Sequence, residues 1–325
     1  MAINQLNKQG TLADIISLLA PGTNLLKTAE IMQKDTPIMK DALYVEANNI
    51  TTHTFAVRSS LPKSSIGKFN EPYGGERGRS KTVTIGLMER INCPAYDARL
   101  VERSGNINQY LNTEAQGIMQ GLAQEVDEDI IYADKNDDFY KFDGLVRYPN
   151  ATNGMLVKGT ATSSSSKITS AYLVAWDVNY GAFMAYPKGT RGGISIENLG
   201  KRVKDYEQGK RMDVYEIKAG ASYGLGVIDE RAVGRICNID VSSISSSTFN
   251  EDKVIELVNK MPSTLRAKAV LYVSRGVKTA IDIKANSKAN VWYSTDNVFG
   301  EPVRTVNGVP VRLDEKISEA EDFVS

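Results

Sequence analysis

Two stretches of alternating apolar and polar residues predict a β-hairpin with a long connection. The first covers residues 50–58 and the second residues 81–91, and alternation with period two is typical of half-buried strands. The predicted apolar face consists of His53, Phe55 and Val57 from the first strand and Val83, Ile85 and Leu87 from the second. A two-stranded hairpin is marginal in water because it cannot bury both faces alone. We therefore expect this one to lie on another copy of the same protein.

The connection between these strands, residues 59–80, is rich in glycine, proline and charge. Connections of this length are uncommon in compact domains and usually have a function of their own. We predict that its charged side chains contact a neighbouring subunit and add little to the folding of a single chain. They are Lys63, Lys68, Glu71, Glu76, Arg77 and Arg79.

A long amphipathic helix is predicted to follow the hairpin. Asn106 with Gln109 marks its start, and apolar residues then recur at spacings of three and four for about six turns, on the order of 35 Å. The predicted core face comprises Leu111, Ala115, Ile118, Met119, Leu122, Val126, Ile130 and Ala133. Gly117 and Gly121 lie within this stripe and indicate close packing or a slight bend.

The rest of the chain indicates an α+β fold class. The predicted organisation is an N-terminal arm with two short helices (1–46), the hairpin (47–95), a helical region (96–141), a compact α+β domain (142–300), and a closing hairpin with an acidic tail (301–325). Within the α+β domain we expect strands at 171–176, 182–186, 213–218 and 270–273, and helices opening at Asn250 and Ser274. Asn307-Gly308 predicts the tight turn of the closing hairpin. Pro310 places its strand at a sheet edge or limits its pairing.

Charge and cysteine content narrow the function classes. Lys plus Arg equals Asp plus Glu, 39 each, whereas a chain that grips nucleic acid over its whole surface is usually strongly basic. Cys93 and Cys237 are the only cysteines, which is too few for a disulfide framework or a zinc site and fits a reducing cytoplasm. The longest apolar stretch, residues 171–176, is too short to span a bilayer. We expect a protein without membrane contact that is cytosolic where it is made.

The candidate catalytic motifs lack essential parts. Gly220-Ala-Ser-Tyr-Gly224 matches the nucleophile-elbow pattern, but the only histidine, His53, lies upstream instead of after the serine. No phosphate-binding or dinucleotide-binding glycine motif is complete. Four clustered aspartates, Asp134, Asp137, Asp138 and Asp143, do not have the spacing of a calcium loop. We expect no catalytic residue, cofactor or metal. The sequence alone does not exclude a pair of carboxylates for hydrolysis, because its 39 acids contain many possible pairs.

The order of these features resembles the tailed-phage major capsid proteins of the HK97-like fold, and is most similar to those of short-tailed phages. The resemblance rests on residues 30–41, 48–62, 114–134, 142–145 and 302–312. It implies an N-arm, an E-loop hairpin, a P-domain with a long spine helix, and an A-domain. It also implies a virion shell of hexamers and pentamers around double-stranded DNA, with portal and scaffolding or cement proteins as further partners. Some members cross-link a lysine to an asparagine; Lys63 and Lys68 lie in the E-loop, but no partner is identifiable.

Three hypotheses follow from the sequence. The first is a shell subunit that contacts packaged DNA only weakly, through local patches such as Lys201–Lys204. The second is a phage tail-tube type subunit, and the third a cytoplasmic carboxylate hydrolase with the hairpin as a dimerisation arm. Particle mass separates them, because a hydrolase stops at a small oligomer, a tube grows open-ended and a shell closes at a defined size.

Overall fold

A computed structural model describes residues 36–324 except 71, 73, 138–140, 164, 191–193, 207–208, 246–247, 286–292 and 299–300. The two helices predicted for the N-terminal arm lie outside the described residues. The chain forms two compact units, each built from segments that are distant in sequence. The first unit includes Glu89–Val126 and Gly193–Ser222, and the second comprises Asp35–Met88, Asp127–Gly192 and Tyr223–Ser325. Residues 193–222, which the sequence places in the α+β domain, therefore group with the long helix.

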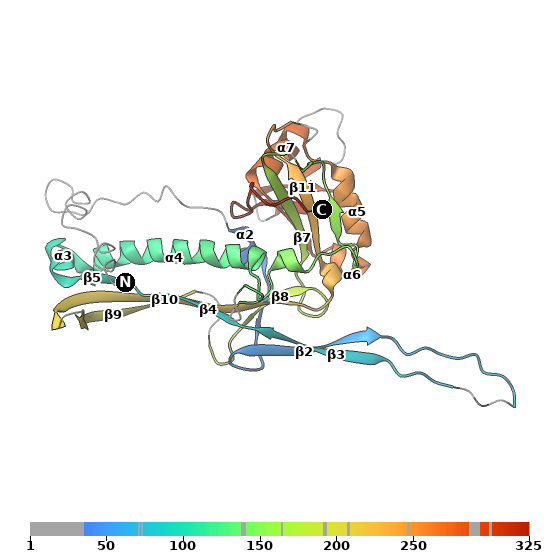
Figure 1. The fold of residues 1–325 in the computed structure, drawn as a ribbon, viewed down its shortest axis with the longest axis horizontal. Coiled ribbons are helices and arrows are strands. Elements are labelled where there is room, and N and C mark those ends of the chain that lie inside the picture. Colours follow the sequence, from blue (N-terminus) through green and yellow to red (C-terminus); the bar gives the residue numbers. More distant parts are fainter. Residues whose placement is uncertain are drawn as a thin grey trace. The chain divides into compact units, whose positions relative to one another are not determined.

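The described elements mix helices and strands, as the sequence predicts (Figure 1). The helices are α2 Pro37–Asp41, α3 Ala98–Arg103, α4 Ile107–Tyr132, α5 Glu251–Lys260, α6 Ser263–Arg266 and α7 Arg275–Ala285. The first strands are β1 Tyr44–Glu46, β2 Thr52–Ser60, β3 Arg79–Gly86, β4 Met88–Asn92, β5 Ala95–Asp97, β6 Leu156–Lys158, β7 Ile168–Ala175 and β8 Ala182–Tyr186. The later strands are β9 Ile194–Asp205, β10 Arg211–Val227, β11 Val233–Asp240, β12 Ala269–Val273, β13 Tyr293–Val298, β14 Glu301–Val306 and β15 Val309–Leu313.

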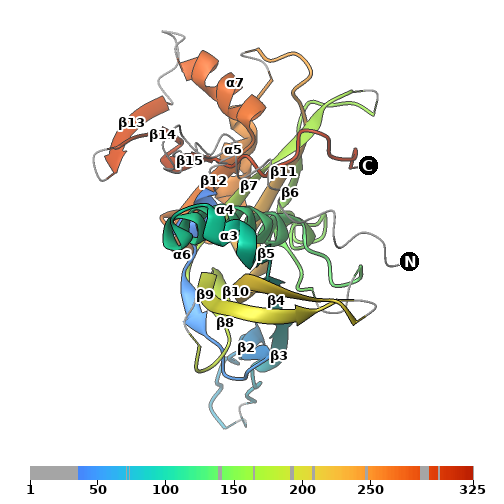
Figure 2. The ribbon, with the colours of Figure 1, turned by 90° about the vertical axis from the view of Figure 1, so that its left-hand side faces the viewer.

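Three sheets organise these strands. A seven-stranded sheet has the order β13-β14-β15-β12-β7-β11-β6, and its strands β12, β7, β11 and β6 lie side by side in Figure 2. A six-stranded sheet has the path β1-β8-β10-β4, with β5 and β9 also paired to β10. β2 and β3 form a separate two-stranded sheet. β7 runs antiparallel to both of its neighbours, whereas β12 pairs with β15 and β11 with β6 in parallel.

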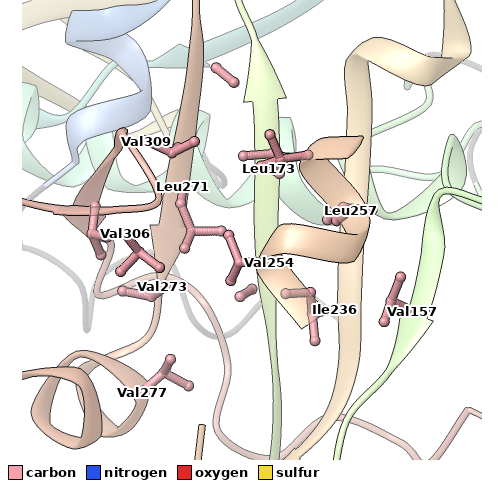
Figure 3. Packing of buried hydrophobic residues seen from close by; sticks show 14 of the residues in the cluster. Val157, Leu173, Ile236, Val254, Leu257, Leu271, Val273, Val277, Val306 and Val309 are labelled. Atoms are coloured by element: carbon pink, nitrogen blue, oxygen red, sulfur yellow. The ribbon is translucent and has the colours of Figure 1, made fainter. Parts of the chain in front are cut away.

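The core of the second unit forms where α5 and α7 cover the seven-stranded sheet with aliphatic side chains (Figure 3). Asn250 caps α5 as predicted, because its side chain accepts a hydrogen bond from the backbone N–H of Asp252 at 2.9 Å. Leu257 is fully buried in this core. Gly234 on β11 permits this packing, because a Cβ there would lie 2.8 Å from atoms of the Leu257 side chain.

In the first unit, α4 packs its apolar stripe against strands. The side chain of Asn106 accepts from the backbone N–H of Gln109 at 3.1 Å and so caps the helix start. The shared cluster consists of Val101, Tyr110, Leu111 and Ile217, with Tyr96, Leu100, Ile107, Ala115, Ile118, Ile196 and Tyr215 packed around it. Along α4, Leu111, Leu122, Val126 and Ile130 are buried and Ile118 is half-buried.

The structure corrects or refines three predictions about α4 and its surroundings. Met119 is 44% exposed, so it lies beside the buried stripe and not within it. A Cβ at Gly117 or Gly121 would meet nothing within 4 Å, so neither glycine serves close packing within the described chain. The strand predicted at 213–218 is confirmed but lies in the first half of a longer strand, β10, which is 17 residues long. Residues 211–221 of β10 pair with β9, which the sequence did not predict.

The closing hairpin confirms the Asn-Gly prediction. Asn307 and Gly308 both have positive φ, at 52° and 76°, and Val306 pairs with Val309 across the turn. The edge position predicted from Pro310 is wrong, because β15 lies between β14 and β12. Pairing with β12 begins only at Val311, one residue after the proline that lacks a backbone N–H. Pro310 therefore limits the pairing of an interior strand.

The acidic C-terminal segment, residues 315–324 (the C-terminal strap), packs against the rest of the chain and is not a solvated tail. Asn238 on β11 exchanges two hydrogen bonds with the backbone of Val324, at 2.7 and 2.9 Å. The Glu321 side chain is only 6% exposed and accepts from Arg235 Nη2 at 2.9 Å. Its partners are the hydroxyls of Tyr132, Ser170 and Tyr172 and the guanidinium of Arg235. Burial raises the pKa of the Tyr132 and Tyr172 hydroxyls, which keeps them protonated as donors.

Candidate assembly surface

The root of the β2–β3 hairpin is fixed by an amide clamp. The Asn48 side chain donates to the carbonyl of Thr54 at 2.7 Å and accepts from its N–H at 2.9 Å. On the other strand, the N–H of Leu87 donates to the carbonyl of Thr51 at 2.9 Å. These bonds tie both strands to the chain that enters and leaves the hairpin, so its starting direction is set locally.

The apolar face of the root packs on β8 of the same chain. Phe183 is 2% exposed, and its ring lies edge-on to Phe55 at 5.7 Å and to His53 at 5.5 Å. Val83 and Ile85 from β3 complete this cluster. The expectation that the hairpin needs another copy to cover this face is therefore wrong for the root, because Phe183 supplies the cover. The alternating residues themselves face the core as predicted.

His53 is a packing residue with a specific hydrogen bond. Its Nδ1 accepts from the backbone N–H of Asn48 at 3.3 Å. Burial lowers the pKa of His53, because partial removal from water disfavours the imidazolium. The neutral ring, with Nδ1 unprotonated, is the form that this hydrogen bond requires.

Beyond the root, the loop of residues 61–78 (the tip loop) is exposed throughout its described residues. Figure 1 shows β2 and β3 side by side, with the chain continuing from them into this loop. The predicted contact residues Lys63, Lys68, Glu76, Arg77 and Arg79 are all exposed, and Glu71 lies outside the described residues. The predicted core residues of α4, apart from Met119, are buried or half-buried, so the two predicted sets differ in exposure.

The sequence interpretation missed the apolar side chains of the tip loop. Ile66 is 92% exposed and Phe69 is 102% exposed, and Leu61 at the start of the loop is 74% exposed. The charge pattern of this segment does not indicate them, since they are isolated among glycine and charged residues. The available signal was an aromatic residue, Phe69, in a segment with no periodicity that could bury it.

The basic stretch that could contact DNA is paired with acids on the same unit. Lys201 and Lys204 lie on β9; the first donates to Glu102 at 2.8 Å and the second to Glu216 at 3.2 Å. The hydrogen bond to Glu102 raises the pKa of Lys201. A third pair joins Arg211 to Asp205 at 2.8 Å. This arrangement leaves little net charge for phosphates.

The structure places the candidate catalytic motifs in unsuitable surroundings. Residues 220–224 lie inside the extended strand β10, whereas a nucleophile elbow needs a sharp strand-to-helix turn. Asp134 pairs with Arg147, and Asp143 with Lys135 at 2.6 Å, so these carboxylates balance nearby cations. Within the described residues, no group of three His, Cys, Asp or Glu side chains is placed to hold a metal. No described helix is long and apolar enough to cross a membrane.

Solved structures identify the fold. A structure of bacteriophage Epsilon15 matches with 21% identity over 98% of both chains and a TM-score of 0.74. The bacteriophage JBD30 capsid matches with 12% identity, covering 89% of this chain and 93% of that chain, at a TM-score of 0.52. The fold is therefore the HK97-like capsid fold that the resemblance implied. No curated protein matches the sequence.

The family model described as major capsid protein GP7 matches residues 20–325. The chain belongs to this family of major capsid proteins. It is a structural subunit of a phage capsid shell that assembles with other copies, and its place is the virion. The hypotheses of a tail-tube subunit and of a carboxylate hydrolase fall with this assignment.

Proposed function

We propose that this subunit closes into hexamers and pentamers of an icosahedral shell around double-stranded DNA, assembled in the cytoplasm of a bacterial host. The observation that carries the proposal is the tip loop, residues 61–78, exposed at the end of a hairpin whose root is fixed on its own chain. A loop on one subunit that docks on a different surface of the next makes a head-to-tail contact, and such contacts form rings when the rotation between neighbours closes.

The difference in burial between the root and the tip of the hairpin supports this assembly mode. The root satisfies its own apolar face through Phe183, so the hairpin does not need a neighbour in order to form. The tip loop has no such cover, and we expect its predicted charged residues to contact an adjacent subunit. In domain terms, we propose residues 1–46 as the N-arm, 47–95 as the E-loop, 142–300 as the A-domain, and the remainder as the P-domain with the C-terminal segment.

We further propose portal and scaffolding or cement proteins as partners, together with weak, non-specific contact with packaged DNA. The weakness follows from charge pairing: Lys201 and Lys204 are already hydrogen-bonded to Glu102 and Glu216. Binding that depends on phosphate contacts scales with the number of cations free to neutralise them. A shell wall with few such cations lets DNA slide during packaging.

Deleting Lys68–Arg77 tests the proposed assembly mode. Because this segment is exposed, we expect the melting temperature of the subunit to stay within about 2 °C of the original, since surface changes are usually worth less than about 0.5 kcal/mol. Shells should be absent by electron microscopy and sedimentation. A variant with a Gly/Ser segment of equal length in place of residues 68–77 is the matched control for loop length. Closed particles of normal size from both variants would refute the role of the tip loop.

A further inference from the structure

The most exposed large apolar side chains among the described residues belong to the tip loop. Phe69 is 102% exposed and Ile66 is 92% exposed. Single exposed apolar residues are common on protein surfaces and need no explanation. Phe69 and Ile66, however, lie only three positions apart in one exposed loop. A few apolar anchors, aromatic ones prominent among them, carry most of the binding energy of many interfaces.

The backbone of the tip loop presents these side chains and offers them no cover. Ser64 bridges Gly75, and the Ser65 hydroxyl donates to the carbonyl of Gly74, which ties the two sides of the loop together. A Cβ built at Gly67, Gly74 or Gly75 would meet no heavy atom within 4 Å. The loop therefore has open space around it where a folded tip would have a core.

The turn next to Phe69 also suits presentation. Asn70 has a φ of 61°, the left-handed conformation that asparagine tolerates better than most residues. Phe69 and Asn70 form a turn. The aromatic ring of Phe69 is therefore exposed at a turn of the tip loop, where a partner can reach it.

We propose that Phe69 and Ile66 anchor the tip loop in an apolar depression on a second copy of this chain, with the surrounding charged residues as a solvated rim. This inference rests on the proposed assembly mode and adds which side chains carry it. The occupant is another copy because the chain belongs to a family of shell subunits, whose functional surroundings are other subunits. Rim ion pairs between exposed side chains contribute little and weaken with salt.

Two sets of variants separate the apolar anchors from the charges. The first set is Ile66→Ser with Phe69→Ser, and its conservative partner is Phe69→Leu. The second set, matched in number of changes and in the same loop, is Lys63→Gln with Arg77→Gln. All four positions are exposed, so each variant should unfold at the temperature of the original subunit, which differential scanning calorimetry checks.

Assembly is measured by sedimentation and light scattering of purified subunits across concentrations, at low salt and at about 1 M salt, where exposed charges are screened beyond about 3 Å. We expect the apolar double variant to raise the concentration needed for assembly by at least about ten-fold, as removal of hot-spot residues does. Phe69→Leu should raise it much less. The charge variant should stay within about three-fold, and high salt should not dissolve the original assemblies.

The outcomes distinguish the two levels of the proposal. Normal assembly of the apolar double variant, or loss of assembly confined to the charge variant and to high salt, overturns the anchor assignment and leaves the tip loop as a charged contact. Original subunits that associate into rings or other multimers without closed shells refute the shell geometry, while the same variants still test the anchors. An original subunit that stays monomeric under all conditions overturns both.

Discussion

The C-terminal strap and the tip loop reverse the usual relation between composition and burial. The strap is acidic, yet Glu321 is almost completely buried and bonded on several sides. The tip loop contains Ile66 and Phe69, yet both are exposed to water. The strap finds its partners within its own chain, on β7, on β11 and at the end of α4. The comparison teaches that a segment's environment depends on which partners the fold supplies, and the fold supplies no cover for Ile66 and Phe69.

The two regions should therefore respond to mutation in opposite ways. A substitution among buried groups acts on the free energy of unfolding of a single subunit. A substitution in the tip loop leaves that free energy nearly unchanged and acts on association between subunits. A tip-loop variant that lowers the free energy of unfolding, or a buried-site variant that affects only association, would contradict this comparison.

The largest effect is expected inside the buried stripe of α4. Leu122 is 3% exposed, and Leu122→Asp would bury a carboxylate without a partner, at a cost on the order of 5 kcal/mol. We expect insoluble or unfolded subunit, measured by the soluble fraction and by circular dichroism. Met119→Asp is the matched control, because that side chain on the same helix is 44% exposed. Soluble, normally assembling Leu122→Asp protein would show that this face is not buried.

A smaller but substantial loss is expected in the strap. Glu321→Ala removes the carboxylate that Arg235 faces, and breaking one side of a buried ion pair costs about 3 kcal/mol or more. Chemical denaturation should show this loss, whereas Asp322→Ala, at an exposed neighbouring acid, should change little. Adding Arg235→Met to Glu321→Leu should cost less than the sum of the two single changes, because the charge is then removed from both sides. Additive losses would mean that the pair is not coupled.

The strap also marks where prediction from sequence stops. Periodicity identified α4, the hairpin strands and the capped α5, since each depends on residues close together in the chain. β11 was missed because Arg235 and Asn238 interrupt its apolar residues. Both are buried, and each is satisfied by the C-terminal strap, 86 residues further along. The local pattern of residues does not indicate a partner that lies so far away in the sequence.

The candidate surface was only partly predictable for a related reason. The length of the connection between β2 and β3 pointed to intersubunit contact, and the exposure of its charged residues agrees with that interpretation. Periodicity, however, carries no information about an irregular loop. The exposure of Phe69 follows from open space around the tip, which is a property of the folded hairpin alone.

The hairpin root is intermediate in burial between the strap and the tip loop, and we expect it to make a small contribution to the pH dependence of stability. The pKa of folded His53 is below its ordinary value of about 6.5, so the unfolded chain takes up a proton first as the pH falls. Stability from neutral His53 is therefore present above about pH 6.5 and is lost as the pH falls through the folded pKa. Protonation also removes the acceptor for Asn48. Because His53 is the only histidine, His53→Gln should show a shallower loss of stability between pH 7.5 and 5.5 in urea titrations. Equal slopes would assign the loss to carboxylates.

The smallest effect is expected for DNA binding. The lysines concerned have partners within their own chain, as the residues of the strap do, and in this they differ from Ile66 and Phe69 of the tip loop. Lys201 and Lys204 are exposed but already paired, so subunits titrated with duplex DNA at near-physiological salt should bind feebly, without sequence preference. Glu102→Gln with Glu216→Gln would remove the nearest carboxylate from each lysine, leaving Lys201 3.7 Å from Asp213. Each cation released for phosphate contact adds about 0.9 to the salt slope of the binding constant, so the double variant should steepen it by up to about 2. An unchanged slope would show that pairing is not what limits binding, and a tight, sequence-selective complex of the original subunit would contradict the proposed weak contact altogether.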